Sequence, residues 1–176
     1  LAKVYRNVFG FNVLPIEGKR PTIPWENWQL IEQTESDVIN LGWNGSVTGI
    51  GGICGINDLR NIDFDKVSDF SIVEIICKRL GLGEKYLWTV KSGSGVGYHL
   101  WLKVRESEIL HKRLNGTKSV YRFYLKDDGL CDHIELRWNN SQTVLPYSKH
   151  ESGNRYSFLY DEPKEPPAEV AADILL

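Results

Sequence analysis

The stretch "LRNIDFDK" (residues 59–66) alternates between two kinds of side chain, and this alternation predicts a β-strand with two unlike faces. Successive side chains of a strand point to opposite sides of a sheet. One side would carry Arg60, Ile62 and Phe64, and the other would carry Asn61, Asp63 and Asp65. We therefore expect an acidic face on this strand.

Asp63 and Asp65 would lie about 6.6 Å apart along the strand, at ~3.3 Å per residue. Their charges repel and aspartate is rare in strands, so a strand that carries both needs a cation or a basic partner. Magnesium binds one or two carboxylates together with substrate phosphates, and a pair of such ions suits phosphoryl transfer. The alternative is that the strand has ended by Asp65, which then begins a turn into Lys66.

A second stretch, "CDHIELRW" (residues 131–138), also alternates. Its apolar side would carry Ile134, Leu136 and Trp138, and its polar side would carry His133, Glu135 and Arg137. Glu135 and Arg137 could form a surface ion pair of little energetic value. They could equally be a metal ligand beside an arginine that binds phosphate through its planar guanidinium. Taken alone, the pattern favours the surface pair.

A third stretch, "SGSGVGYHLWLKV" (residues 92–104), leads from glycines into strand-like alternation. A Walker loop needs Gly-Lys-Ser/Thr and a following helix, and a dinucleotide-binding loop also needs a helix. Neither fits here, so we expect a hairpin turn that ends at His99, on the same face as Trp101 and Lys103. Exposed glycine amides bind anions, so a triphosphate could meet His99 at this turn.

The rest of the chain predicts an α+β fold with a mainly antiparallel or mixed sheet, because helices interleave with neighbouring strands. Helices are expected at residues 1–10, 25–33, 71–80 and 107–114, and at the start of 168–176. Strands are expected at residues 11–16, 59–65, 86–92, 98–104, 119–126, 130–138, 143–148 and 155–160, with short strands in the glycine-rich stretch 40–58. Ser71 and Glu74 predict a capping box, and Phe70 could pack against Ile75.

Composition narrows the class of protein. The chain has 176 residues, of which 41% are hydrophobic and 25% charged, so one domain with a full core is expected. The net charge of −2 excludes a generally basic nucleic-acid coat. The three cysteines form no Cys-x-x-Cys pair, which argues against a disulfide framework or a structural zinc site and favours a cytoplasmic protein. The sequence has no apolar run long enough to predict a membrane span. Because the chain begins at Leu1 and has no methionine, we expect a fragment of a longer protein.

The order of these stretches is an Asp-x-Asp strand, a glycine-preceded strand with histidine, and a strand with Glu-x-Arg. In this order they resemble the archaeo-eukaryotic primase superfamily, most closely the primase-polymerase (Prim-Pol) branch in replication proteins of plasmids, viruses and phages. The resemblance spans roughly residues 1–160. It includes "GFNVLPIEGKRPTIPW" (residues 10–25), "SVTG" (residues 46–49) and "TVLPYSKHESGNRYSF" (residues 143–158).

The resemblance implies an RRM-like catalytic sheet with an N-terminal α/β unit packed against it. It also implies template-directed nucleotidyl transfer from nucleoside triphosphates, that is, DNA primase and DNA polymerase activity, with Mg²⁺ or Mn²⁺. The metal ligands, which are also the catalytic residues, would be Asp63, Asp65 and Glu135. The residues at the nucleotide would be His99, which contacts its phosphates, Arg137, which contacts its phosphates or the template, and Ser148 and His150.

Two positions depart from the family pattern. Tyr147 stands where the family has the second proline of Pro-Pro-Ser, and Gly97 stands where it has the serine of Ser-x-His. The backbone N–H of Gly97, or the hydroxyl of Ser92 or Ser94, could replace the missing hydroxyl contact to phosphate. Gly97 is therefore also a predicted nucleotide-binding residue.

The resemblance also suggests the setting of the domain. Residues 1–160 would be the catalytic domain, and residues 161–176 a proline-rich linker with the start of a following segment, plausibly a helicase. The partners would be nucleoside triphosphates and a single-stranded DNA template or primer–template, in replication of a mobile element, virus or phage. Two alternatives are a non-catalytic nucleic-acid-binding module of a replication initiator and a metal-dependent phosphohydrolase.

A basic run between Lys103 and Lys126, interleaved with aromatic residues, would suit a nucleic-acid strand. For individual residues an ordinary solvated face is the simpler interpretation. Trp25 and Trp101 are candidates for stacking on bases.

Overall fold

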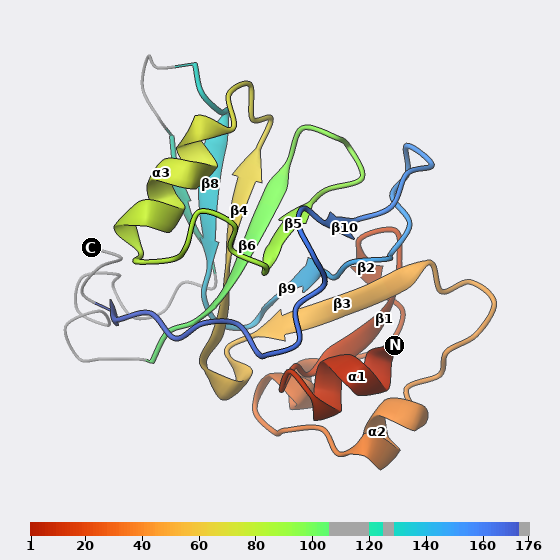
Figure 1. The fold of residues 1–176 in the computed structure, drawn as a ribbon. Coiled ribbons are helices and arrows are strands. Elements are labelled where there is room, and N and C mark those ends of the chain that lie inside the picture. The colour runs from red at the N-terminus through yellow and green to blue at the C-terminus, as the bar shows by residue number, and fades with distance from the viewer. Residues whose placement is uncertain (106–119, 125–128, 173–176) are drawn as a thin grey trace.

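The computed structural model describes residues 1–105, 120–124 and 129–172 of the chain (Figure 1). Its helical elements are α1 (Ala2–Asn7), η1 (Glu26–Gln29), α2 (Glu35–Ile39), η2 (Ile56–Asp58) and α3 (Ser71–Arg79). Its strands are β1 (Val13–Glu17), β2 (Arg20–Pro21), β3 (Gly49–Cys54), β4 (Leu59–Asp65), β5 (Thr89–Lys91), β6 (Tyr98–Lys103), β7 (Val120–Phe123), β8 (His133–Arg137), β9 (Ser141–Val144) and β10 (Ser157–Phe158). The predicted α+β class is confirmed.

The larger sheet has six strands in the order β10-β5-β6-β4-β8-β7, and each neighbouring pair is antiparallel. Its inner part, β5-β6-β4-β8, is built by β4, then α3, then the β5–β6 hairpin and finally β8 on the far side of β4. This is the split β-α-β-β-(α)-β arrangement, which agrees with the RRM-like sheet that was predicted. The helix predicted at residues 107–114 lies outside the described residues.

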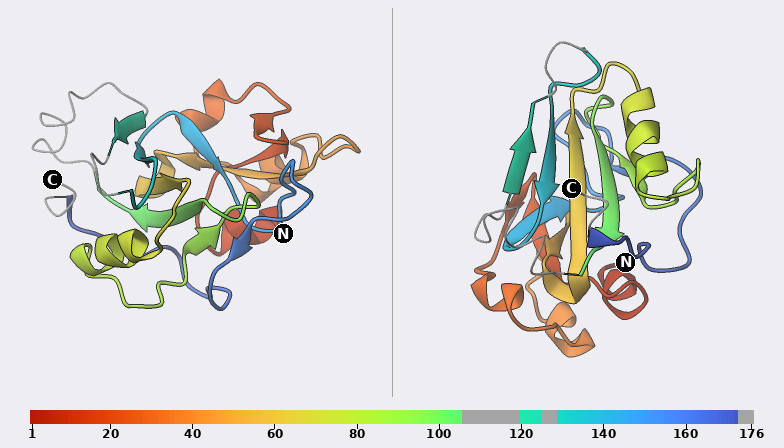
Figure 2. Two further views of the ribbon diagram at one scale, coloured as in Figure 1. Left: turned by 90° about the horizontal axis from the view of Figure 1, so that it is seen from above. Right: turned by 90° about the vertical axis from the view of Figure 1, so that its left-hand side faces the viewer.

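The helix α3 covers one face of the six-stranded sheet, as the right-hand view of Figure 2 shows, and the side chains between them are mainly apolar. This core contains the following buried side chains: Ile62, Phe64, Ile72, Val73, Cys77, Leu100, Leu102, Ile134, Leu136 and Trp138. The members from β4, β6 and β8 are the even-numbered ones, as the alternation of strand side chains requires. The odd-numbered side chains of these strands therefore point to the other face.

The smaller sheet has the order β2-β1-β3-β9, and its strands run in a clearly different direction from β4 (Figure 1). Its core joins the two sheets, because Trp101 of β6 packs edge-on against Phe11 with 4.8 Å between ring centroids. The helices α1 and α2 lie beside this smaller sheet. Together these elements form the predicted N-terminal α/β unit, to which the chain returns to add β9.

The segment after β10 lies along the body of the domain. The backbone oxygen of Glu165 accepts a hydrogen bond from Trp88 Nε1 at 2.8 Å, and Glu169 forms a parallel bridge with Lys103. Val170 is buried. The predicted start of a helix at residue 168 is therefore wrong for its first residues, which pair in extended form, and residues 173–176 lie outside the described part. The boundary expected at residue 160 stays a prediction.

The helix predicted at residues 25–33 is wrong in extent, because only Glu26–Gln29 are helical and they form a 3₁₀ turn. The side-chain amide of Gln33 donates to Val13 O at 2.9 Å and accepts from Val13 N at 2.7 Å, which continues the sheet beside β1. The apolar side chains before Gln33 are left exposed, Leu30 by 82%.

The predicted capping box of Ser71 and Glu74 is also wrong. Ser71 is already the first residue of α3, and its N–H donates a hydrogen bond to Asp69 Oδ1 at 2.9 Å. Phe70 packs instead against Tyr98, and Ile75 remains 45% exposed. A true capping box occurs at the start of α2, between Thr34 and Asp37.

In the part of the chain that the structure describes, no helix has both the length and the apolar character needed to cross a bilayer.

Candidate active site

Asp63 lies near the end of β4, and both of its neighbours across the sheet are predicted site residues. It pairs with His99 on β6 and with Glu135 on β8. Directly opposed residues in neighbouring strands have their side chains on the same face. Three residues that are distant in the sequence therefore form one row across the polar face of the sheet.

Arg137 follows Glu135 by two residues on β8, so its side chain lies on the same face. Its Nη2 is 3.0 Å from Asp63 Oδ2 and 2.7 Å from Glu135 Oε2. The two carboxylates thus share one guanidinium nitrogen, which offsets their mutual repulsion. Burial lowers the pKa of Arg137, but the charges of Asp63 and Glu135 raise that pKa above its usual value overall.

Asp65 is the last residue of β4 and has the most exposed carboxylate of the three, with 51% of its side chain accessible. It pairs with His133 on β8, whose Nε2 is 3.0 Å from Asp65 Oδ2 and 3.7 Å from Glu135 Oε1. The strand ends directly afterwards, where Lys66 adopts a φ of 48°. Asp65 therefore keeps its place on the acidic face before the turn begins.

His99 is buried beside Asp63, with its Nε2 3.5 Å from Asp63 Oδ1. Burial lowers the pKa of His99, and Arg137 and Lys19 lower it further, against the opposing effect of Asp63. The imidazole is therefore neutral at neutral pH and offers one N–H donor. The ring of Tyr156 lies 5.6 Å from that of His99, and burial raises the pKa of Tyr156 to about 12.

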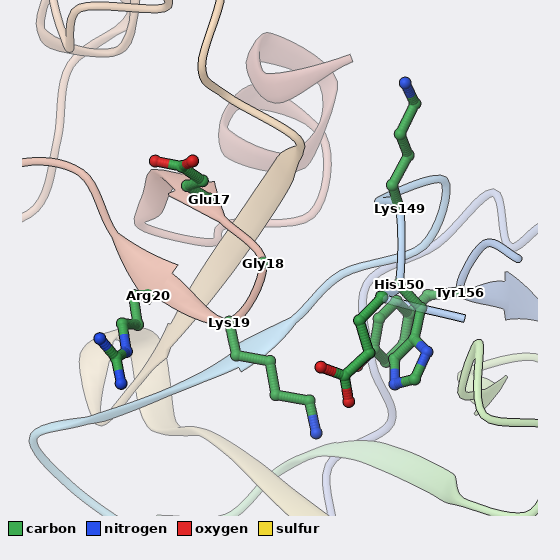
Figure 3. A pocket seen from close by; sticks show the side chains of 8 residues that line it. Glu17, Gly18, Lys19, Arg20, Lys149, His150 and Tyr156 are labelled. Atoms are coloured by element: carbon green, nitrogen blue, oxygen red, sulfur yellow. The ribbon is translucent and has the colours of Figure 1, made fainter. Parts of the chain in front are cut away.

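A cavity of about 230 Å³ opens over these side chains. Its walls come from both sheets and consist of Lys19, Asp63, His99, Arg137, Gln142, Thr143, Val144 and Tyr156. A second cavity of about 300 Å³ contains His150 and shares Lys19 and Tyr156 with the first (Figure 3). The two cavities therefore adjoin, and they place the predicted residues Asp63, His99, Arg137 and His150 along one cleft.

Ser148 lies at the edge of this region with its hydroxyl used by the backbone. Its Oγ accepts from Ile50 N at 2.9 Å and lies 3.4 Å from Ile50 O. A Cβ added to Gly49 would overlap the Ser148 side chain. In this structure Ser148 therefore fastens the segment that carries His150 to β3, and a contact of Ser148 with nucleotide stays a prediction.

The glycine turn before His99 closes the β5–β6 hairpin, since Ser92 N donates to Gly97 O at 2.9 Å. Its first glycine matters most for the cleft, because a Cβ on Gly93 would overlap the Cβ of His150. Gly93 O also accepts from Ser152 Oγ at 2.7 Å. The loop that bears His150 is thus docked directly on Gly93.

In this turn the positive φ, 84°, belongs to Gly95 and not to Gly97. A Cβ on Gly97 would lie 3.0 Å from Ser92 Oγ, so the position is tight. Its role at the nucleotide stays a prediction.

Four side chains of this region were not assigned from the sequence. His133 shares the face of Glu135 by simple alternation, so the pattern could have revealed it. Arg122, whose Nε donates to Glu135 Oε1 at 2.8 Å, is recognisable only from the pairing of β7 with β8. Lys19 and Tyr156 reach the cleft from distant segments, and no local pattern indicates this.

The nucleic-acid surface expected along the basic run from Lys103 to Lys126 stays a prediction. Of the basic run, Lys112, Arg113, Lys118 and Lys126 lie outside the described residues. Arg105 forms an ion pair with Glu169 at 3.2 Å. The stacking role expected for Trp101 is wrong, because that side chain is fully buried between the two sheets, and Trp25 is partly buried against the same core.

The donor set fits a divalent metal ion chemically. Carboxylate oxygens are the ligands that Mg²⁺ and Mn²⁺ prefer, and Asp63 and Glu135 already hold one guanidinium nitrogen between them, where a shared cation would lie. Within residues 1–105, 120–124 and 129–172, no three acidic, histidine or cysteine side chains form a ready-made metal cluster. The position between the two carboxylates is taken by Arg137 Nη2 in this structure.

The family model for Prim-Pol, described as the N-terminal domain of bifunctional DNA primase/polymerase, matches residues 2–172. The chain therefore belongs to the Prim-Pol family, whose activity is that of a DNA primase and polymerase. No curated protein matches the chain.

Proposed function

We propose that this domain catalyses template-directed nucleotidyl transfer from nucleoside triphosphates by a two-metal mechanism. The observation that carries the proposal is the row formed by His99, Asp63 and Glu135 on adjacent strands. A row of carboxylates on a sheet face, neutralised by arginine and open to a cleft, suits a reaction in which positioning and electrostatics supply most of the catalysis.

Asp63, Asp65 and Glu135 would hold Mg²⁺ or Mn²⁺. When bound, such ions supply Lewis-acid activation of the attacking 3′-hydroxyl and charge neutralisation at the leaving pyrophosphate. Asp65, as the most exposed of the three carboxylates, would face the primer end.

Arg137 changes partners in this proposal. With the carboxylates holding metal, its planar guanidinium would be free to donate to phosphate oxygens, a role for which arginine geometry is well suited. His99 donates its single N–H to a phosphate without adding charge. The Gly97 backbone and His150 would complete the nucleotide site, with Ser148 fixing the His150 segment to β3.

The substrates would be nucleoside triphosphates and a single-stranded DNA template or primer–template. We place the reaction in replication of a mobile element, virus or phage, with residues 1–160 as the catalytic part and a helicase following in the full-length protein. These assignments of substrate, biological process and following domain go beyond the family membership and are part of the proposal.

Primer extension on a labelled primer–template tests the proposal. The wild-type domain should add nucleotides in the order set by the template when Mg²⁺ or Mn²⁺ is present, and Asp63→Asn should not. Binding of DNA with no extension under any metal or nucleotide would favour a non-catalytic nucleic-acid-binding module. Release of phosphate without templated product would favour a phosphohydrolase.

A further inference from the structure

Lys19 occupies a distinctive place in the cleft, because it lines both cavities. On one side it shares the smaller cavity with Asp63, His99 and Arg137. On the other it shares the larger cavity with His150. A ligand that spans both cavities would therefore come close to Lys19.

The backbone of Lys19 is held firmly although it lies at the tip of a hairpin. Glu17 pairs with Arg20, so the turn between β1 and β2 has only two residues, and the first of them, Gly18, has a φ of 61°. This matches the tight hairpin type that needs glycine first. Gly18 N donates to Thr48 Oγ1, and Gln142 Nε2 donates to Lys19 O, each at 2.7 Å. Both residues of the turn are therefore hydrogen-bonded through their backbone to other parts of the domain.

The Lys19 side chain is not used for structure. It forms no ion pair or side-chain hydrogen bond with any residue that the structure describes. Figure 3 shows it extending from the turn toward the space beside His150 and Tyr156, whereas Lys149 points away from it. Although Lys19 is exposed, its hydrogen-bonded backbone keeps an ammonium group without an ion pair beside both cavities, where it can meet an anion.

We propose that Lys19 binds the β- and γ-phosphates of the incoming nucleoside triphosphate. This assignment rests on the proposed function, because it takes the reacting α-phosphate to lie at Asp63, Glu135 and Arg137. From that point the two remaining phosphates extend into the adjoining cavity past Lys19. An ammonium group binds phosphate as a compact charge with three donors.

The test compares Lys19→Ala and Lys19→Arg with Lys78→Ala, a control on the exposed side of α3 across the sheet. Steady-state primer extension should show KM for nucleotide raised about 10- to 100-fold in Lys19→Ala, the range expected for one charge-assisted hydrogen bond. The kcat should change much less than KM. Lys19→Arg should recover most of the loss, and Lys78→Ala should match wild type.

Direct binding separates this assignment from the proposed function. In Lys19→Ala, affinity for thymidine triphosphate should fall while affinity for thymidine monophosphate and for single-stranded DNA stays constant. If DNA affinity falls and triphosphate affinity does not, Lys19 contacts a strand phosphate and the proposal is overturned. If neither changes, it is overturned as well. A wild-type domain that extends no primer but loses triphosphate affinity in Lys19→Ala would refute the function and retain the Lys19 site.

Discussion

Both faces of β4 are largely buried, but one is packed with apolar side chains and the other with polar and charged ones. On the α3 face Ile62 and Phe64 are buried among apolar residues of α3, β6 and β8. The buried charge on this side of β4, Arg60, lies 4.2 Å from the ring of Trp138. The other face is almost as enclosed, yet Asn61, Asp63 and the facing Glu135 are polar or charged. On that face the guanidinium groups of Arg122 and Arg137 offset the carboxylate charges, whereas water would solvate them on an ordinary surface.

This difference separates the residues that stabilise the fold from those whose burial costs stability. Burying a charge costs free energy unless it is paired, so a core built for stability alone would not collect these groups on one sheet face. The cluster is therefore best explained by chemistry. The apolar face should carry stability, and the charged face should carry activity.

The largest effect expected on the charged face is the loss of extension activity in Asp63→Asn. Amide oxygen is a weaker ligand than carboxylate, and even outer partners of metal ligands change affinity or activity by 10- to 100-fold. We expect more than about a 100-fold loss of extension. Asparagine keeps the volume of aspartate, and Arg137 keeps its contact with Glu135, so the thermal midpoint should shift by only a few degrees. The exposed Glu84→Gln serves as the matched control.

A folded Asp63→Asn variant with normal extension would contradict the division between the two faces. So would a variant that loses activity only because it no longer folds. Circular dichroism melts beside primer extension distinguish the outcomes.

On the apolar face we expect Phe64→Ala to reduce the free energy of unfolding by about 3–5 kcal/mol, as is typical for deletion of a buried phenyl ring. Phe64 is fully buried under α3. Ile75→Ala, at a position on α3 that is 45% exposed, should cost less than about 1 kcal/mol. Denaturant unfolding measures both. A Phe64→Ala domain of near wild-type stability would show that α3 does not pack as described.

The sequence predicted the parts of this arrangement that depend on alternation. The strand at residues 59–65, the acidic face, the Glu-x-Arg strand and the glycine hairpin could all be read from the side-chain period of two. The α+β class followed from the order of the elements. Asp63, His99 and Glu135 could be placed on faces, but that they form one row depends on sheet register, which only tertiary pairing fixes.

Other features could not be predicted because they are decided by distant contacts. The helical turn ends at Gln29, and the side chain of Gln33 bonds to the backbone of Val13, a contact that no local pattern indicates. The spacing of Ser71 and Glu74 fits a capping box, but Ser71 lies inside the helix and its N–H donates to Asp69 Oδ1. Lys19 enters the cleft only because the β1–β2 turn is fastened to β9.

A smaller effect is expected at Gly93, where the β5–β6 turn supports the charged face. A methyl group there would overlap the Cβ of His150, and relieving that overlap must move the loop. We expect Gly93→Ala to raise KM for nucleotide about tenfold and to cost about 1–3 kcal/mol, as for other overpacked sites. Gly83→Ala, where an added Cβ meets nothing within 4 Å, is the control. An unchanged KM would separate the His150 loop from the nucleotide site.

The smallest effect is expected at Ser148, which tests whether every polar group near the cleft belongs to the reaction. Its hydroxyl accepts a hydrogen bond from Ile50 N at 2.9 Å, so Ser148→Ala leaves a buried N–H without that partner. Such a loss costs about 1–3 kcal/mol of stability. KM for nucleotide should change by less than about threefold, and the exposed Ser157→Ala should change neither quantity. If Ser148→Ala instead raises KM strongly at constant stability, the hydroxyl contacts the nucleotide directly. Ser148 would then be a nucleotide-binding residue, and its hydrogen bond with Ile50 would not be its main role.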